Sequence, residues 1–142
     1  MKKIVFLVFA ALAFSYSSGA QDLKAKNVPE VVKTALMKKY PNATKVSWEK
    51  EKGNYEANWG GKSGEDTSVQ FTPAGIFVEE VDAIKVSELP ANIPHFVKAY
   101  YKGAKINEAG RVTDAKGTKM YEAEIKGKDL LFDEKGNFIK VD

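Results

Sequence analysis

Few residues in this chain could act as catalysts. Its 142 residues include one histidine, His95, and no cysteine. Thiol nucleophiles, cysteine-based zinc or iron–sulfur sites and multi-histidine metal sites are therefore excluded. A serine hydrolase would need a nucleophile beside the histidine, and no Gly-x-Ser-x-Gly segment is present. His95 falls opposite the apolar stripe of a predicted helix, which favours a surface residue, so we expect no catalytic residue and no enzymatic activity.

Two short motifs suggest phosphate or metal binding but lack a required residue. Gly61-Lys62-Ser63 resembles the end of a phosphate-binding loop, yet Glu56 stands where the first glycine is needed. Asp133-x-Lys135-x-Asn137 resembles the start of a calcium loop, yet Phe138 replaces its glycine. Both segments are typical of hairpin turns, so we expect no metal site and no cofactor.

Adjacent acidic residues occur at Glu65-Asp66 and Glu79-Glu80. Glycoside hydrolysis would need two carboxyl groups about 5–10 Å apart across a cleft. Neighbouring strand residues point to opposite faces, and we expect a small curved sheet to offer little cleft. We therefore interpret these acids as charges that block pairing at sheet edges.

The aromatic residues give the remaining functional signal. Tryptophan and tyrosine are common anchors of binding surfaces, because they provide a large contact area at a low entropy cost. They also fill the space between a helix and a sheet, and alternation with polar neighbours favours that interpretation for some of them. Both interpretations stay open for the candidate binding residues, which are Trp48, Tyr55, Trp59, Tyr100 and Tyr121.

The chain repeats itself at one constant spacing, called the repeat interval below. The segments from Val28 to Val81 and from Leu89 to Val141 carry the same residue types at matching positions. Pairs with the same spacing are Pro29/Pro90, Tyr40/Tyr101, Ala43/Ala104, Phe71/Phe132, Gly75/Gly136 and Phe77/Phe138. Two copies are too few for a solenoid, so we expect a duplication in which the halves share one core.

Each copy begins with a helical pattern and continues with strands. Apolar residues at helical spacing predict a helix over residues 28–40 and another over 93–101, with Asn92 as the N-cap of the second. Apolar and polar residues then alternate with period two between glycine-containing turns. The sequence predicts an α+β fold of two α-β-β-β-β repeats, residues 28–84 and 89–142. They form an antiparallel curved sheet with both helices on one face and a linker near 83–88.

Residues 1–20 resemble a secretory signal. Lys2 and Lys3 precede an apolar run from Ile4 to Phe14, and Ser18 and Ala20 fit a cleavage site. The run is well short of the roughly 20 residues that cross a bilayer as a helix. We expect cleavage before Gln21, leaving residues 21–142 as a single periplasmic or secreted domain without a membrane anchor.

The charge balance argues against a nucleic-acid partner. Loss of Lys2 and Lys3 would lower the net charge from +3 to +1. Nucleic-acid binding needs clustered positive charge, whereas lysine and glutamate alternate over residues 49–52. We expect a protein or peptide partner instead.

The second copy carries the pattern Leu89-Pro90-x-x-Ile93, then Tyr101-x-Gly103-Ala104, then Leu131-Phe132-Asp133-x-x-Gly136-x-Phe138. This pattern resembles the PepSY-like, β-lactamase-inhibitor-protein-like family of small exported bacterial proteins, and the resemblance covers residues 28–142. It implies tandem α-β4 units and no known catalytic role. The first copy departs from the pattern in its last turn and in a longer loop over residues 60–67.

Two functions fit these observations. The first is an exported, non-catalytic binding protein that presents the open face of its sheet to a partner, as an inhibitor or modulator of an envelope or extracellular protein. The alternative is a small-molecule or peptide binder with a pocket between the helices and the sheet, near Tyr40, Trp48, Trp59 and Tyr101.

Overall fold

The computed structural model describes residues 20–142, so most of the predicted signal segment lies outside the described residues. Nine strands form one antiparallel sheet in which every strand pairs with its neighbours in sequence. The elements in chain order are β1 (Gln21–Leu23), η1 (Ala25–Asn27), α1 (Glu30–Lys39), β2 (Ser47–Glu51), β3 (Asn54–Trp59), β4 (Thr67–Phe71), β5 (Phe77–Ile84), η2 (Val86–Glu88), α2 (Asn92–Tyr100), β6 (Glu108–Asp114), β7 (Lys119–Ile125), β8 (Lys128–Asp133) and β9 (Phe138–Val141). Within the described range, no helix has the length and apolar character to cross a membrane.

The duplication predicted from the sequence is visible in the order of the elements. Helix α1 precedes strands β2–β5, and α2 precedes β6–β9. Each helix buries two side chains one turn apart at matching positions, Val32 and Leu36 in α1 and Ile93 and Val97 in α2. The α-β4 pattern and the antiparallel sheet are confirmed.

The repeat extends further towards the N-terminus than the sequence pattern indicated. Leu23 in β1 pairs with Trp48, and Ile84, one repeat interval after Leu23, pairs with Ala109 in the same way. Strand β1 therefore corresponds to the last residues of β5. The prediction of a linker from residue 83 was wrong at its start, because Ala83 and Ile84 still belong to β5.

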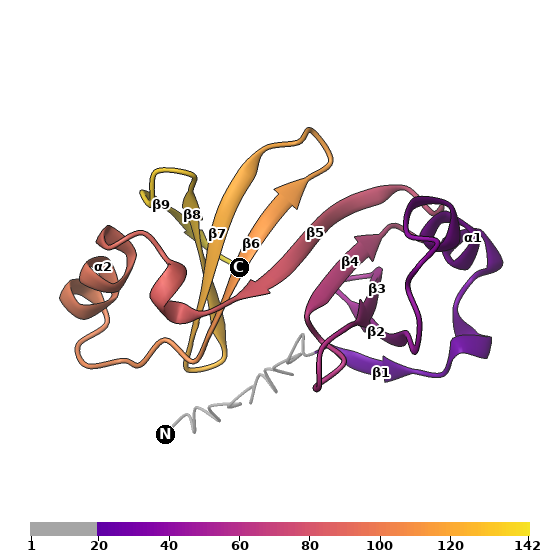
Figure 1. Cartoon of the computed structure of the whole chain (residues 1–142), viewed down its shortest axis with the longest axis horizontal. Helices are drawn as coiled ribbons and strands as arrows, with labels where there is room; N and C mark the ends of the chain where they lie inside the picture. The colour runs from indigo at the N-terminus through magenta and orange to yellow at the C-terminus, as the bar shows by residue number, and fades with distance from the viewer. Residues whose placement is uncertain (1–19) are drawn as a thin grey trace, which may run out of the picture.

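Both helices cover the same face of the sheet, as predicted. One row of paired residues crosses it from Trp59 in β3 to Phe132 in β8, so these two side chains point to the same side. Trp59 packs against the cluster under α1, and Phe132 belongs to the cluster under α2. In Figure 1 the helices lie at opposite outer ends of the molecule, with the strands between them.

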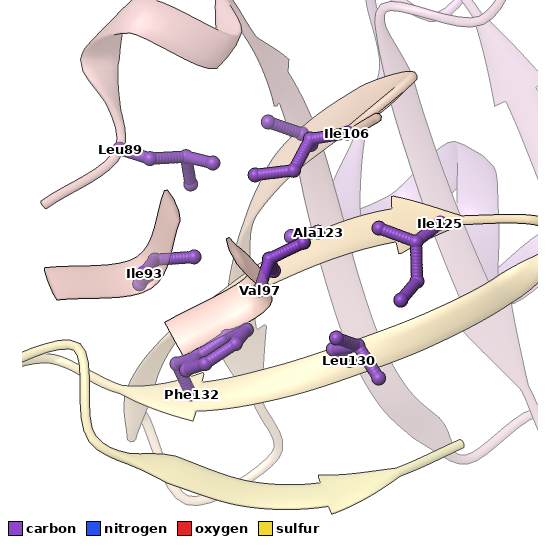
Figure 2. Packing of buried hydrophobic residues seen from close by; sticks show 9 residues of the cluster. Leu89, Ile93, Val97, Ile106, Ala123, Ile125, Leu130 and Phe132 are labelled. Atoms are coloured by element: carbon purple, nitrogen blue, oxygen red, sulfur yellow. The ribbon is translucent and has the colours of Figure 1, made fainter. Parts of the chain in front are cut away.

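The expectation of one shared core was wrong, because the buried apolar residues under the helices form two clusters. The α1 cluster consists of Val28, Val32, Leu36, Trp48, Ala57, Val69 and Phe71. The α2 cluster, shown in Figure 2, consists of Leu89, Ile93, Val97, Ile106, Ala109, Ala123, Ile125, Leu130 and Phe132.

Polar residues on the helix-covered face of the central strands keep the two clusters apart. Glu80 and Asp82 of β5 and Arg111 of β6 lie in the rows between them. Each has a partner: Glu80 accepts a hydrogen bond from the Tyr40 hydroxyl, Asp82 accepts one from Thr67 at 3.2 Å, and the Arg111 guanidinium lies 5.8 Å from the Tyr121 ring centroid. Burial raises the pKa of Tyr40, and Glu80 raises it further, so the hydroxyl remains a donor.

Asn92 does not act as the N-cap predicted for it. Helix α2 begins at Asn92, and its side-chain amide donates to the carbonyls of Lys135 at 3.0 Å and Gly136 at 2.8 Å. These bonds fix the β8–β9 turn to the start of the helix. The approach is so close that a Cβ on Gly136, whose φ is +81°, would lie 2.7 Å from Asn92 Nδ2. Glycine is needed at position 136 because of the positive φ and because a side chain there would collide with Asn92.

Candidate binding face

The face of the sheet opposite the helices, called the open face below, carries many acidic side chains around the buried Val112 and Leu131. One row of paired residues crosses it through Glu49, Glu56, Gln70 and Glu79. A second row in the other repeat places Glu122 beside Leu131 of β8. Because side chains alternate along each strand, these residues all point away from α1 and α2.

A groove of about 360 Å³ lies on the open face and is lined by residues of both repeats. Its carboxylates are Glu51, Glu56, Glu79, Glu122, Asp129 and Asp142. A second hollow of about 200 Å³ shares Glu56 and Glu122 with the groove and continues towards Glu49, Glu65 and Glu108. The expectation that the sheet would offer little cleft was wrong, because nine twisted strands curve into a concave surface.

Burial changes the proton affinity of the carboxyl groups in the groove. It raises the pKa of Glu122 to about 8, with further contributions from the negative charges of Asp129 and Glu79. Burial also raises the pKa values of Glu56, Glu79 and Asp129. The Gln70 amide, 3.0 Å from Glu56 Oε2, partly opposes this effect at Glu56.

Two lysines border the groove, and both contact the same carboxylate. Lys52 Nζ lies 2.9 Å and Lys140 Nζ 3.2 Å from Asp142 Oδ1. The hydrogen bond from Lys52 lowers the pKa of Asp142. Because both ammonium groups are bound to Asp142, the other five carboxyl groups give the groove an acidic character.

The five candidate aromatic residues lie on the helix side of the sheet, away from the open face. Trp48 is buried in the α1 cluster with 6% of its surface exposed, and Tyr55 and Trp59 pack against that cluster. Tyr121 packs against the α2 cluster. Tyr100 is 72% exposed at the end of α2. Four of the five therefore pack between a helix and the sheet, the alternative that alternation in the sequence favoured for some of them.

The pocket expected between the helices and the sheet is not formed by the residues proposed for it. Tyr40, Trp48 and Trp59 pack in the α1 cluster, where the ring centroids of Tyr40 and Trp59 are 5.2 Å apart. Tyr101 belongs to the other cluster. These four residues therefore cannot line one pocket.

The adjacent acids Glu79 and Glu80 point to opposite faces, as predicted, but their interpretation as edge charges was wrong. They lie on β5, the central strand of the sheet. Glu79 lines the groove, whereas Glu80 is bonded by Tyr40 on the other face. Sequence reasoning missed Glu79 because its neighbours in the groove come from distant strands.

The remaining candidates occupy the places expected from the sequence. His95 is exposed on α2. Gly61-Lys62-Ser63 forms a turn, and Asp133 Oδ1 accepts the backbone N–H groups of Lys135 and Asn137 across the β8–β9 turn. Between residues 20 and 142 no three His, Cys, Asp or Glu side chains are grouped so that they could hold a metal ion.

Comparison with known proteins identifies the family. A family described as "Putative beta-lactamase-inhibitor-like, PepSY-like" matches the chain twice, over residues 16–78 and 60–140. No curated protein matches it.

Three solved structures of low sequence identity share the fold. A protein of Bacteroides eggerthii described as "putative periplasmic" is 24% identical with a TM-score of 0.64, covering 81% of this chain and 88% of its own. A DUF2874 family protein of Bacteroides uniformis is 24% identical with a TM-score of 0.63, covering 80% and 88%. A BLIP-like protein of Bacteroides fragilis is 20% identical with a TM-score of 0.57, covering 80% and 84%. With its two family matches, one over each repeat, this chain belongs to the PepSY-like, β-lactamase-inhibitor-like family.

Proposed function

We propose that this protein is an exported, non-catalytic binding protein whose open face takes a protein or peptide partner with basic side chains. It acts as an inhibitor or modulator of an envelope or extracellular protein. The secretory pattern of residues 1–20 and the description of a structural relative as periplasmic support export to the periplasm.

The observation that carries this proposal is the acidic groove between the repeats. Its carboxylates come from β2, β3, β5, β7, β8 and the C-terminal residue, so they meet only in the folded chain. Partly burying carboxylates that repel one another costs free energy, and the raised pKa of Glu122 reflects this cost. A partner that brings ammonium or guanidinium groups would offset this cost on binding.

The dimensions of the groove suit side chains of a partner. A volume of about 360 Å³ lies at the lower end of the range of about 300–1,000 Å³ for small ligand sites. Arginine is well suited to this groove, because its guanidinium forms bidentate hydrogen bonds with carboxylates. The second hollow, towards Glu108, extends the acidic surface along the sheet and would accommodate the rest of an extended segment.

Titration calorimetry with an octa-arginine peptide tests the proposal. We expect binding to the wild-type chain, and a loss of affinity of about tenfold or more in the Glu79→Gln/Glu122→Gln variant. The matched control is Glu30→Gln/Glu134→Gln, which makes the same two substitutions outside the two hollows of the open face. At neutral pH it removes at least as much charge, because a pKa of about 8 keeps Glu122 mostly protonated. The affinity of this control should stay within about twofold of the wild type. Equal losses in both variants would mean that the peptide senses only net charge, and the proposal would be wrong.

A further inference from the structure

The second repeat has another hollow on the helix side of the sheet, away from the acidic groove. It measures about 610 Å³ and lies between η2, α2 and the segment that leads into β6. Its apolar lining residues are Val86, Pro94, Val97, Ala104 and Ile106.

The floor of this hollow is the outer side of the α2 cluster. Val97 is 2% exposed and Ile106 9% exposed. Figure 2 shows both side chains among the residues of the cluster. Val86, by contrast, is 36% exposed at one wall, although it is a large apolar residue on the surface. The hollow therefore combines a rigid apolar floor with an apolar wall that faces water.

Two lysines complete the lining, Lys98 from α2 and Lys105 from the segment before β6. Within residues 20–142 neither lysine takes part in an ion pair. Two ammonium groups beside an apolar floor complement a ligand that has an aliphatic part and an anionic group.

The first repeat provides an internal comparison. One repeat interval earlier in the chain, Met37 and Thr44 stand in place of the two lysines. Lys45 stands in place of Ile106, whereas Leu36, the counterpart of Val97, is buried as Val97 is. Since both repeats form the same α-β4 unit, the fold itself does not require Ile106 or the two lysines at these positions.

We propose that this hollow, the α2 hollow, binds a single-chain amphiphile with a carboxylate head. The aliphatic chain lies over Pro94, Val97 and Ile106, and the carboxylate lies between Lys98 and Lys105. The volume is within the range of about 300–1,000 Å³ for small-molecule sites. Attachment to an anionic membrane surface instead takes a cluster of about 4–8 basic residues, more than the two found here.

Titration calorimetry of residues 21–142 with dodecanoate, at concentrations below the micelle concentration of dodecanoate, tests this site. We expect saturable binding that weakens about tenfold or more in Lys98→Gln/Lys105→Gln. The matched control, Lys38→Gln/Lys62→Gln, removes the same charge elsewhere and should bind as the wild type does. Val86→Asn, which changes an exposed wall without opening a core cavity, should also weaken binding.

Dodecylammonium and vesicles of anionic phospholipid provide the ligand controls. The cationic amphiphile should bind about tenfold more weakly than dodecanoate, because its head meets the two lysines. The proposal would be overturned if dodecanoate did not bind, or if the two amphiphiles bound equally well. It would also be overturned if both lysine variants lost the same affinity, or if the protein bound the vesicles and not dodecanoate. Because the groove and the α2 hollow share no residues, either result leaves the octa-arginine experiment unaffected.

Discussion

Lys52 Nζ lies 2.9 Å from Asp142 Oδ1, although the two residues stand far apart in the chain. Lys52 belongs to the β2–β3 turn of the first repeat, and Asp142 follows β9 in the second. The pair therefore joins the two ends of the curved sheet across the acidic groove, which both residues line.

Lys52→Met should loosen the end of the chain without unfolding the protein. The two side chains are 46% and 37% exposed, so the pair contributes at most about 1 kcal/mol. The Asp142 amide, which donates to the Asp129 carbonyl at 2.8 Å, should exchange its hydrogen faster in the variant. Hydrogen exchange followed by NMR measures this, with Lys62→Met as the control. Unchanged exchange at Asp142 would show that the pair does not hold the C-terminus.

The free energy of unfolding should fall as the pH rises from about 4.5 to about 8, where Glu122 is ionised in the unfolded state but still protonated in the folded state. Its pKa is about 8 in the folded protein against an ordinary value of 4.5, so the folded state holds this proton more tightly than the unfolded state. The resulting stabilisation is complete below pH 4.5 and is lost by about pH 8, a change on the order of 5 kcal/mol. Urea unfolding at a series of pH values measures it. Glu122→Gln should flatten the pH dependence of the unfolding free energy, and Glu30→Gln should not. The same slope against pH in the wild type and both variants would contradict the burial of Glu122.

Gly136→Ala should destabilise the protein more than Gly117→Ala does. Both glycines have φ of +81°, so alanine meets the same backbone strain of about 1 kcal/mol at each position. A Cβ at Gly117 meets no atom within 4 Å, whereas one at Gly136 displaces Asn92 and breaks its hydrogen bonds to the turn. The additional loss should be about 1–2 kcal/mol in thermal or urea unfolding. Equal losses would mean that Asn92 does not fix the turn to α2.

Core substitutions in the two repeats should have additive effects. Val32→Ala in the α1 cluster and Ile93→Val in the α2 cluster should each cost about 1–2 kcal/mol, since both residues are fully buried. Because the clusters are separate, the double variant should lose the sum of the two within about 0.5 kcal/mol. A larger coupling energy in urea unfolding would instead support the single shared core that the sequence suggested.

Much of the fold could be predicted because its signals are local and occur twice. The repeat interval and the change from helical to alternating spacing indicated both helices and the α-β4 order. Strand β1 was missed, since three residues are too short to show any periodicity. Asn92 was misassigned because its partner, the β8–β9 turn, is distant in the chain and comes close only in the fold.

The candidate site was harder to predict because it depends on which strands become neighbours. Glu56, Glu79 and Glu122 lie on three different strands, and nothing near each of them in the sequence distinguishes it from an ordinary surface acid. For Trp48 and Trp59 the sequence left open an anchor role or packing between helix and sheet, and both pack under α1. Alternation separates the two faces of a strand, but the register of the whole sheet decides which acids share a groove.

Backbone amide chemical shifts recorded during titration with octa-arginine show directly which face of the folded protein the peptide contacts. We expect saturable shifts on the strands that line the groove, strongest around Glu56, Glu79 and Glu122, with little change in α1 and α2. Shifts confined to the helices, or an absence of saturable shifts, would contradict binding through the open face.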